Sequence, residues 1–151
     1  MSMEAPDLRR FVDAQAPVFD TVMGELRSGR KRSHWMWYVF PQITGLGNSA
    51  TSRFYAIRDL DEARAYLAHP VLGARLRECV QALLVHADRP AVEILGDIDG
   101  AKLKSCLTLF LQVATQPEDR RLFEQALVAF FSGEADRATL RILEEQASGR
   151  A

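Results

Sequence analysis

Residues 31–42, KRSHWMWYVFPQ, place basic and titratable side chains directly before the densest aromatic run of the chain. Lys31 could neutralise an anion, and His34 could transfer a proton, because a histidine side chain ordinarily titrates near neutral pH. Trp35 and Trp37 offer ring faces on which a planar ligand could stack. No nucleophile accompanies His34 and the histidines form no zinc motif, so we expect no metal or other cofactor.

The same residues can also be interpreted without a ligand. A basic run beside a turn is usually solvated, and a histidine beside two tryptophans is more often structural than catalytic. If a helix begins at Ser33, however, Lys31, Arg32 and His34 place positive charge near its N-terminus, against the helix dipole, at a cost of about 0.3–1 kcal/mol each when exposed. The arrangement becomes favourable when an anion binds there, since the N–H groups and the cations then face one ligand.

A second segment, GLGNSATS at residues 45–52, combines glycines and hydroxyl side chains ahead of the helical RFYAI. The backbone amides of such a loop can hold a phosphate group, and Arg53 follows directly. The pattern lacks the Lys-Ser/Thr ending and the preceding strand of a P-loop, and Gly-Asn-Ser turns are commonly only turns. Its closeness to His34 in the sequence favours one cleft shared by the two segments.

Helical periodicity dominates the elements that must position these side chains. In DLRRFVDAQAPVFDTVMGELRSG, apolar residues recur at three- and four-residue spacing. Asp7 is the expected N-cap, Pro17 should divide the helix, and Gly29 should end it. Further helices are expected over residues 61–68, 69–88 with Pro70 in the first turn, 91–96, 99–116, 117–133 and 134–146.

The apolar run from Trp35 to Phe40 is too short for periodicity to distinguish a strand from a helix. In an otherwise helical chain we predict a helix with Ser33 as N-cap and Pro41 at its end, surrounded by the other helices. No stretch alternates with period two. The predicted fold class is all-α, a single compact multihelical domain spanning residues 1–151, with an ordered core of about 7–145. We expect about seven or eight helices around this central aromatic-rich helix.

Composition bounds the class of protein. The 151 residues are 48% hydrophobic and 26% charged, which is typical of one globular domain. A net charge of −1 gives no general attraction to nucleic acid, no apolar stretch is long enough to span a bilayer, and MSMEAPDLRR has no signal-peptide core. We therefore expect a soluble cytoplasmic protein without a nucleic-acid or membrane partner. Cys79 and Cys106 lie in apolar helical patterns and should be buried free thiols.

Several motifs together resemble a bacterial family of unknown function whose members are often mislabelled "calpastatin". The resemblance is carried by GRKRSHWMWYVFPQITGLGNSATSRFYAI, EARAYLAHPVLGARLREC, DGAKLKSCLTLF and FFSGEADRATLRIL, in this order, over about residues 8–143. It implies a compact multihelical fold and no established activity, and nothing in the sequence supports protease inhibition. This chain has Ser105-Cys106 where the family pattern has two serines. The polar members of the pattern exceed what a core requires; they are Lys31, Ser33, His34, Gln42, Arg53, Tyr55, Lys102 and Ser105.

Two hypotheses of different class follow. The first is a cleft for a small anionic or nucleotide-like ligand, lined by the KRSHWMW-FPQ segment and the GLGNS loop, with His34 as the catalytic candidate if there is a reaction. Its ligand-binding candidates are Lys31, Ser33, Trp35, Trp37, Gln42, Ser49, Arg53, Tyr55, Lys102 and Ser105. The alternative is a protein-interaction module in which a Trp/Phe/Tyr surface docks a partner. The pair Asp97 and Asp99 is interpreted as helix caps.

Overall fold

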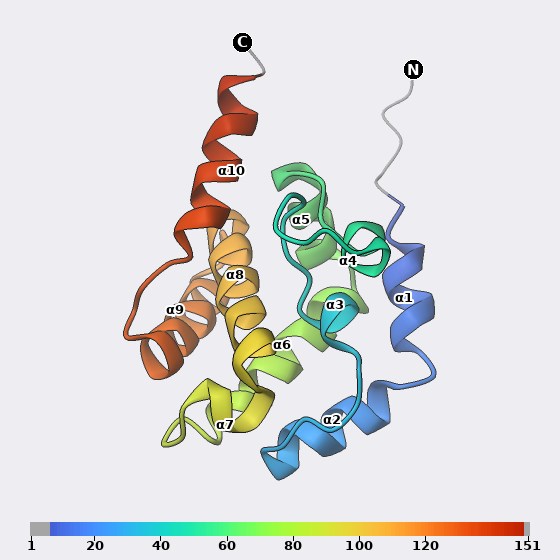
Figure 1. The fold of residues 1–151 in the computed structure, drawn as a ribbon, viewed down its shortest axis with the longest axis vertical. Coiled ribbons are helices and arrows are strands. Elements are labelled where there is room, and N and C mark those ends of the chain that lie inside the picture. Colours follow the sequence, from blue (N-terminus) through green and yellow to red (C-terminus); the bar gives the residue numbers. More distant parts are fainter. Residues whose placement is uncertain (1–6, 150–151) are drawn as a thin grey trace.

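The helical periodicity of the sequence is realised as ten helices in the computed structural model, which describes residues 7–149 (Figure 1). The helices are α1 (Arg9–Gln15), α2 (Phe19–Ser28), α3 (Met36–Val39), α4 (Ala50–Phe54), α5 (Leu60–Ala68), α6 (Leu72–Leu84), α7 (Ala91–Leu95), α8 (Asp97–Val113), α9 (Pro117–Phe131) and α10 (Arg137–Ser148). Residues 7–149 form one all-α domain, as predicted, with a single isolated bridge between Ile43 and Ile57. The number exceeds the expected seven or eight because the N-terminal segment forms two separate helices, α1 and α2, and because α4 is an additional helix of five residues.

Proline and glycine divide the chain largely where the sequence predicts. The predicted N-terminal helix is divided near Pro17 into α1 and α2. Gly29 ends α2 in the left-handed conformation, with φ of 75°. A side chain at position 29 would be strained there and would also collide with Arg89. Gly96, with φ of 91°, separates α7 from α8.

Two predicted helix starts are wrong. The N-cap of α1 is Leu8, and Asp7 instead accepts a hydrogen bond from the Arg9 N–H at 3.0 Å. Pro70 precedes α6, whose N-cap residue is Val71. The Nδ1 atom of His69 accepts from the N–H groups of residues 71 and 72 at 3.1 and 3.2 Å. The His69 imidazole therefore satisfies N–H groups at the start of α6, and the proline lies outside the helix.

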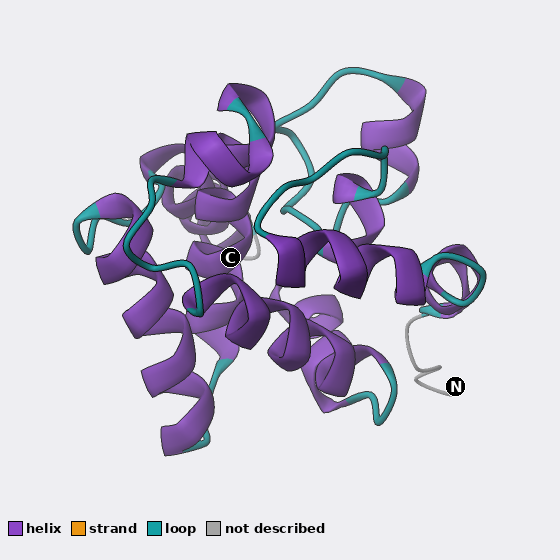
Figure 2. Cartoon of the chain, turned by 90° about the horizontal axis from the view of Figure 1, so that it is seen from below, coloured by secondary structure: helices purple, strands orange, loops and turns teal. Residues whose placement is uncertain are grey.

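The central helix of the domain is α8, whereas the sequence predicts that the aromatic run at residues 35–40 forms the central helix. In Figure 1 α8 runs vertically through the molecule, and it packs against α5, α7, α9 and α10. The aromatic run forms only the single turn α3, with Trp35 rather than Ser33 as the N-cap residue and Phe40 as the C-cap residue. Figure 2 shows that the chain is mostly helix, with loops and turns between the helices. The predicted central aromatic helix is therefore wrong, although Trp35, Met36, Val39 and Phe40 are buried.

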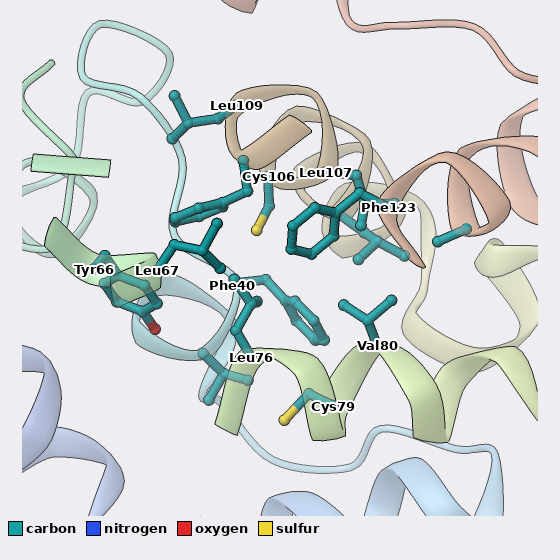
Figure 3. Packing of buried hydrophobic residues seen from close by; sticks show 14 of the residues in the cluster. Phe40, Tyr66, Leu67, Leu76, Cys79, Val80, Cys106, Leu107, Leu109 and Phe123 are labelled. Carbon is teal, nitrogen blue, oxygen red and sulfur yellow. The ribbon is translucent and has the colours of Figure 1, made fainter. Parts of the chain in front are cut away.

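The core is continuous from α1 to α9, and its aromatic rings are in contact. The ring of Tyr66 lies 5.1 Å from that of Phe11, edge to face, and 5.2 Å from that of Phe110. Phe40, Tyr66, Cys106 and Phe123 surround the same interior space in Figure 3. The Tyr66 hydroxyl accepts a hydrogen bond at 3.0 Å from the buried Gln15 amide, which also donates to the Tyr38 carbonyl oxygen at 2.7 Å. This amide joins α1, α3 and α5.

None of the helices described in residues 7–149 combines the length and the apolar character that crossing a membrane requires.

Both cysteines should be unreactive in the folded protein. Cys79 and Cys106 are free and buried, as predicted. Burial, together with the negative charge of Glu78, raises the pKa of Cys79 to about 12, and burial raises the pKa of Cys106 well above its usual range. We expect a thiol-specific chromogenic reagent to label neither cysteine in native protein and both in denaturant. Rapid labelling of the native protein would contradict this packing.

Candidate functional site

A single carboxylate, that of Glu25 in α2, holds the segment from Arg32 to Trp35 in place. It accepts hydrogen bonds from the Arg32 N–H (2.7 Å), the Ser33 N–H (3.1 Å), the Ser33 hydroxyl (2.5 Å) and the Trp35 indole N–H (2.9 Å). Burial alone would raise the pKa of Glu25, but these bonds outweigh it and lower the pKa to about 2. The Ser33 hydroxyl therefore donates to Glu25 and does not cap a helix, which explains why the predicted N-cap at Ser33 is wrong.

Residues 31–37, which include the Glu25-bound segment, form one wall of a cleft whose other wall is the junction of α7 and α8. A backbone hydrogen bond of 2.8 Å from the Lys31 N–H to the Ile94 carbonyl oxygen joins the two walls. The cleft has a volume of about 480 Å³ and is lined by Lys31, His34, Met36, Trp37, Leu95, Gly96, Asp97, Ile98, Asp99 and Lys102. It is the place where the predicted residues Lys31, His34, Trp37 and Lys102 meet.

Two lysines share one carboxylate inside this cleft. The Lys31 ammonium lies 2.8 Å from one oxygen of Asp99, and the Lys102 ammonium lies 3.7 Å from the other. The side chain of Lys31 is only 8% exposed. The chain contains three lysines in all, so two of the three are placed beside the same aspartate.

The two lysines differ in what their ammonium groups can still bind. Lys31 donates to the Ser33 carbonyl oxygen at 2.6 Å as well as to Asp99, and its ammonium faces the Trp35 ring at 5.0 Å. An ammonium has three donors, so Lys31 has little left for a ligand. Lys102 makes no hydrogen bond to any residue in 7–149; its ammonium lies 4.8 Å from the Trp37 ring centroid, and its side chain is 19% exposed.

His34 lies at the edge of the cleft with an exposed ring. Neither of its ring nitrogens has a hydrogen-bond partner within the described residues. Among the same residues, no three His, Cys, Asp or Glu side chains are grouped to hold a metal ion. The cleft can therefore offer a ligand an ammonium, an imidazole and an indole.

The predicted loop at residues 45–52 does not contribute to this cleft. With Gln42, Arg53 and Tyr55 it lines a separate hollow of about 20 Å³, which has only Trp37 in common with the cleft. The Arg53 guanidinium donates to the Asn48 carbonyl oxygen at 2.6 Å and is exposed. Trp37 and Gln42 of the first segment thus meet the loop, whereas Lys31 and His34 line the other cleft, so the expected single cleft is divided into two hollows with Trp37 between them.

Four more predicted residues have structural partners. Ser33 and Trp35 bind Glu25, as described above. Ser49 caps α4, where its hydroxyl accepts from the Ser52 N–H at 3.0 Å. The buried Ser105 donates to the Asp136 carboxylate at 3.1 Å and so ties α8 to the first turn of α10.

Sequence reasoning missed Asp99 as a site residue. It was interpreted as a helix cap, yet it lies inside the first turn of α8 and joins both lysines. A signal was present, because Asp99 and Lys102 are three residues apart on a helix and such pairs face each other. The pairing with Lys31, 68 positions away, depends on the tertiary path through α7 and has no local signal.

The Glu25→Gln variant should be less stable than wild type because a neutral amide oxygen accepts the three N–H donors more weakly than a carboxylate does, and the NH₂ group replaces the oxygen that accepts from the Ser33 hydroxyl. Hydrogen bonds to charged groups are worth about 1.5–3 kcal/mol each, so we expect a loss of about 2 kcal/mol in the free energy of unfolding near neutral pH. The pKa of Glu25 is lower in the folded protein than its usual 4.5, so this advantage is complete above about 4.5 and fades as the pH falls toward about 2.

Urea unfolding of both proteins across this pH range measures the difference. The exposed Glu78, on α6, makes no hydrogen bond in the described residues, so Glu78→Gln is the matched control and should unfold as wild type does. Equal stability of the Glu25→Gln and Glu78→Gln variants at neutral pH would refute the role assigned to Glu25.

Comparison with known proteins places the chain in a family without assigning an activity. A search of solved structures finds the crystal structure of the conserved hypothetical protein Rv1873 from Mycobacterium tuberculosis, with 46% sequence identity and a TM-score of 0.87. The match covers 91% of this chain and 96% of that one. No curated protein matches. The family model described as "Protein of unknown function (DUF1810)" matches residues 5–143. The resemblance seen in the motifs is thereby confirmed, and the chain belongs to this family.

Proposed function

We propose that the cleft between the Glu25-bound segment and α8 binds a small organic anion that carries a ring. The observation that carries the proposal is Lys102, whose side chain is only 19% exposed and whose ammonium has no hydrogen-bond partner in residues 7–149. Its ion pair with Asp99, at 3.7 Å, is too long for a hydrogen bond, so a ligand can supply the acceptors that the ammonium lacks within these residues. A carboxylate or phosphate oxygen in the cleft would do so.

The ring of the ligand is suggested by Trp37. This side chain is half-buried, lines the cleft and lies directly beneath the Lys102 ammonium. A ligand whose anionic group binds Lys102 therefore has an indole within reach of its remaining atoms. Contact between an aromatic side chain and a planar ring contributes about 1–3 kcal/mol in nucleic-acid complexes, which is enough to favour ring-bearing anions.

The N-terminus of α8 also favours a negatively charged ligand. The cap residue Gly96 has no side chain to offer, and the N–H groups of residues 97–99 have no acceptor within the described chain. Residues 96–99 line the cleft, so the positive end of a 17-residue helix faces the ligand. Asp97 and Asp99 offset part of this field.

The proposal concerns binding. His34 stands at the cleft edge and could exchange a proton with a ligand, but the described residues place no nucleophile in hydrogen-bond contact with its ring. A protein-interaction surface is less well supported, because Trp35 and Phe40 of the aromatic run are 1% and 0% exposed and cannot dock a partner.

Ligand binding should depend on Lys102 and not on the neighbouring Lys104. We expect at least one anion from a panel of inorganic phosphate, AMP, cyclic AMP, benzoate and phthalate to raise the melting temperature of the wild-type protein. A ligand at about 100 times its Kd stabilises a protein by about 2.7 kcal/mol, which is several degrees for a domain of this size. Lys102→Met keeps an unbranched side chain over Trp37, and it should weaken binding by about tenfold or more.

Lys104→Met is the matched control, since it removes the same charge from the same helix at a residue that does not line the cleft. Quenching of tryptophan fluorescence provides a second readout, because Trp37 is one of only two tryptophans. The proposal fails if no anion in the panel binds, or if the Lys102→Met protein binds as tightly as the Lys104→Met protein.

A further inference from the structure

We infer that Asp99 makes the cleft selective for singly charged anions, such as carboxylates and phosphodiesters, over doubly charged ones such as phosphomonoesters. This inference rests on the proposed function and adds to it the charge class of the ligand. It follows from how the two ammonium groups and the Asp99 carboxylate are arranged.

One negative charge stands between two positive ones. The Asp99 oxygens lie 2.8 Å from the Lys31 ammonium and 3.7 Å from the Lys102 ammonium. The three groups together carry one net positive charge. The arrangement is shielded, because the side chains of Lys31, Asp99 and Lys102 are 8%, 19% and 19% exposed. Charges in such a place are screened much less than charges on the open surface.

The available positive charge is located on Lys102. Lys31 forms the shorter contact with Asp99 and directs its other donors to the Ser33 carbonyl oxygen and the Trp35 ring. Lys102 is too far from Asp99 for a hydrogen bond and has no acceptor in residues 7–149. One negative charge on a ligand can therefore pair with the Lys102 ammonium.

A second negative charge on the ligand would find no cation. The charged residues that line the cleft are Lys31, Lys102, Asp97 and Asp99, with His34 as the remaining titratable group. Two lysines and two aspartates sum to zero when His34 is neutral, and no arginine lines the cleft. The additional charge of a dianion would lie near the Asp99 carboxylate, where like charges repel strongly.

Matched ligand pairs test the inference. Cyclic AMP and AMP share a base and a ribose, and benzoate and phthalate share a ring, but the second member of each pair carries one more negative charge. At about pH 8 a phosphomonoester is doubly charged, because its second pKa is about 6. We expect wild-type protein to bind the singly charged member of a pair about tenfold more tightly, or more, by isothermal titration calorimetry.

Asp99→Asn should reverse much of this preference, because it leaves two ammonium groups beside a neutral amide. We expect the affinity ratio of dianion to monoanion to rise by about tenfold or more in this variant. Glu93→Gln is the charge-matched control: Glu93 is on α7, its side chain is 57% exposed and it does not line the cleft. Its ratio should equal that of wild type.

The outcomes separate this inference from the proposed function. If wild-type protein binds a pair with equal affinity or prefers the dianion, or if Asp99→Asn leaves the ratio unchanged, the charge selectivity is overturned and the ligand site stands. If none of the four probes binds wild-type protein, the proposed site for a ring-bearing anion is overturned, and the charge selectivity with it. The wild-type comparison needs no variant, so the test remains decisive even if Asp99→Asn protein fails to fold.

Discussion

The candidate site depends on the carboxylate of Glu25. It lies in the last part of α2, where a negative charge is unfavourable because the C-terminal end of a helix is itself negative. Four donors from the next ten residues offset this cost and fold the chain back on the helix. The fold-back buries the Trp35 indole and directs Lys31 toward α8.

Most of the helices could be predicted from the sequence because their signals are local. Gly29, Gly96 and Pro117 mark helix boundaries by backbone constraints that act on the residue itself, and the structure places a boundary at each. Ser33 could not be assigned correctly in this way. A serine before an apolar run is a good N-cap, but its hydroxyl and N–H bind a carboxylate eight residues earlier. Nothing in the local pattern shows which of the two partners the serine takes.

The site could be predicted only in part, for the same reason. Lys31, His34 and Lys102 are polar residues of the family pattern beyond the needs of a core, Trp37 is a predicted stacking ring, and the four do line one cleft. Ser105 is also a polar residue beyond the needs of a core, but its hydroxyl binds the Ala101 carbonyl oxygen and the Asp136 carboxylate within the fold. Residue type indicates capacity for chemistry, whereas only the packing of α7 against α8 determines which groups meet. Asp99 was overlooked because its cap-like position gave a sufficient local explanation.

Trp37 is the wall common to the cleft and to the small hollow under the loop at residues 45–52. That loop is tightly folded: a side chain at Gly47 would approach the Ser52 hydroxyl to 2.7 Å. A change that enlarges the loop toward this hollow would press on the indole and alter the shape of the cleft. The loop at residues 45–52 therefore influences the shape of the cleft, whereas Lys31, Asp99 and Lys102 determine its charge. Divergent members of such a fold can reshape the space around a ring while leaving every charged group untouched.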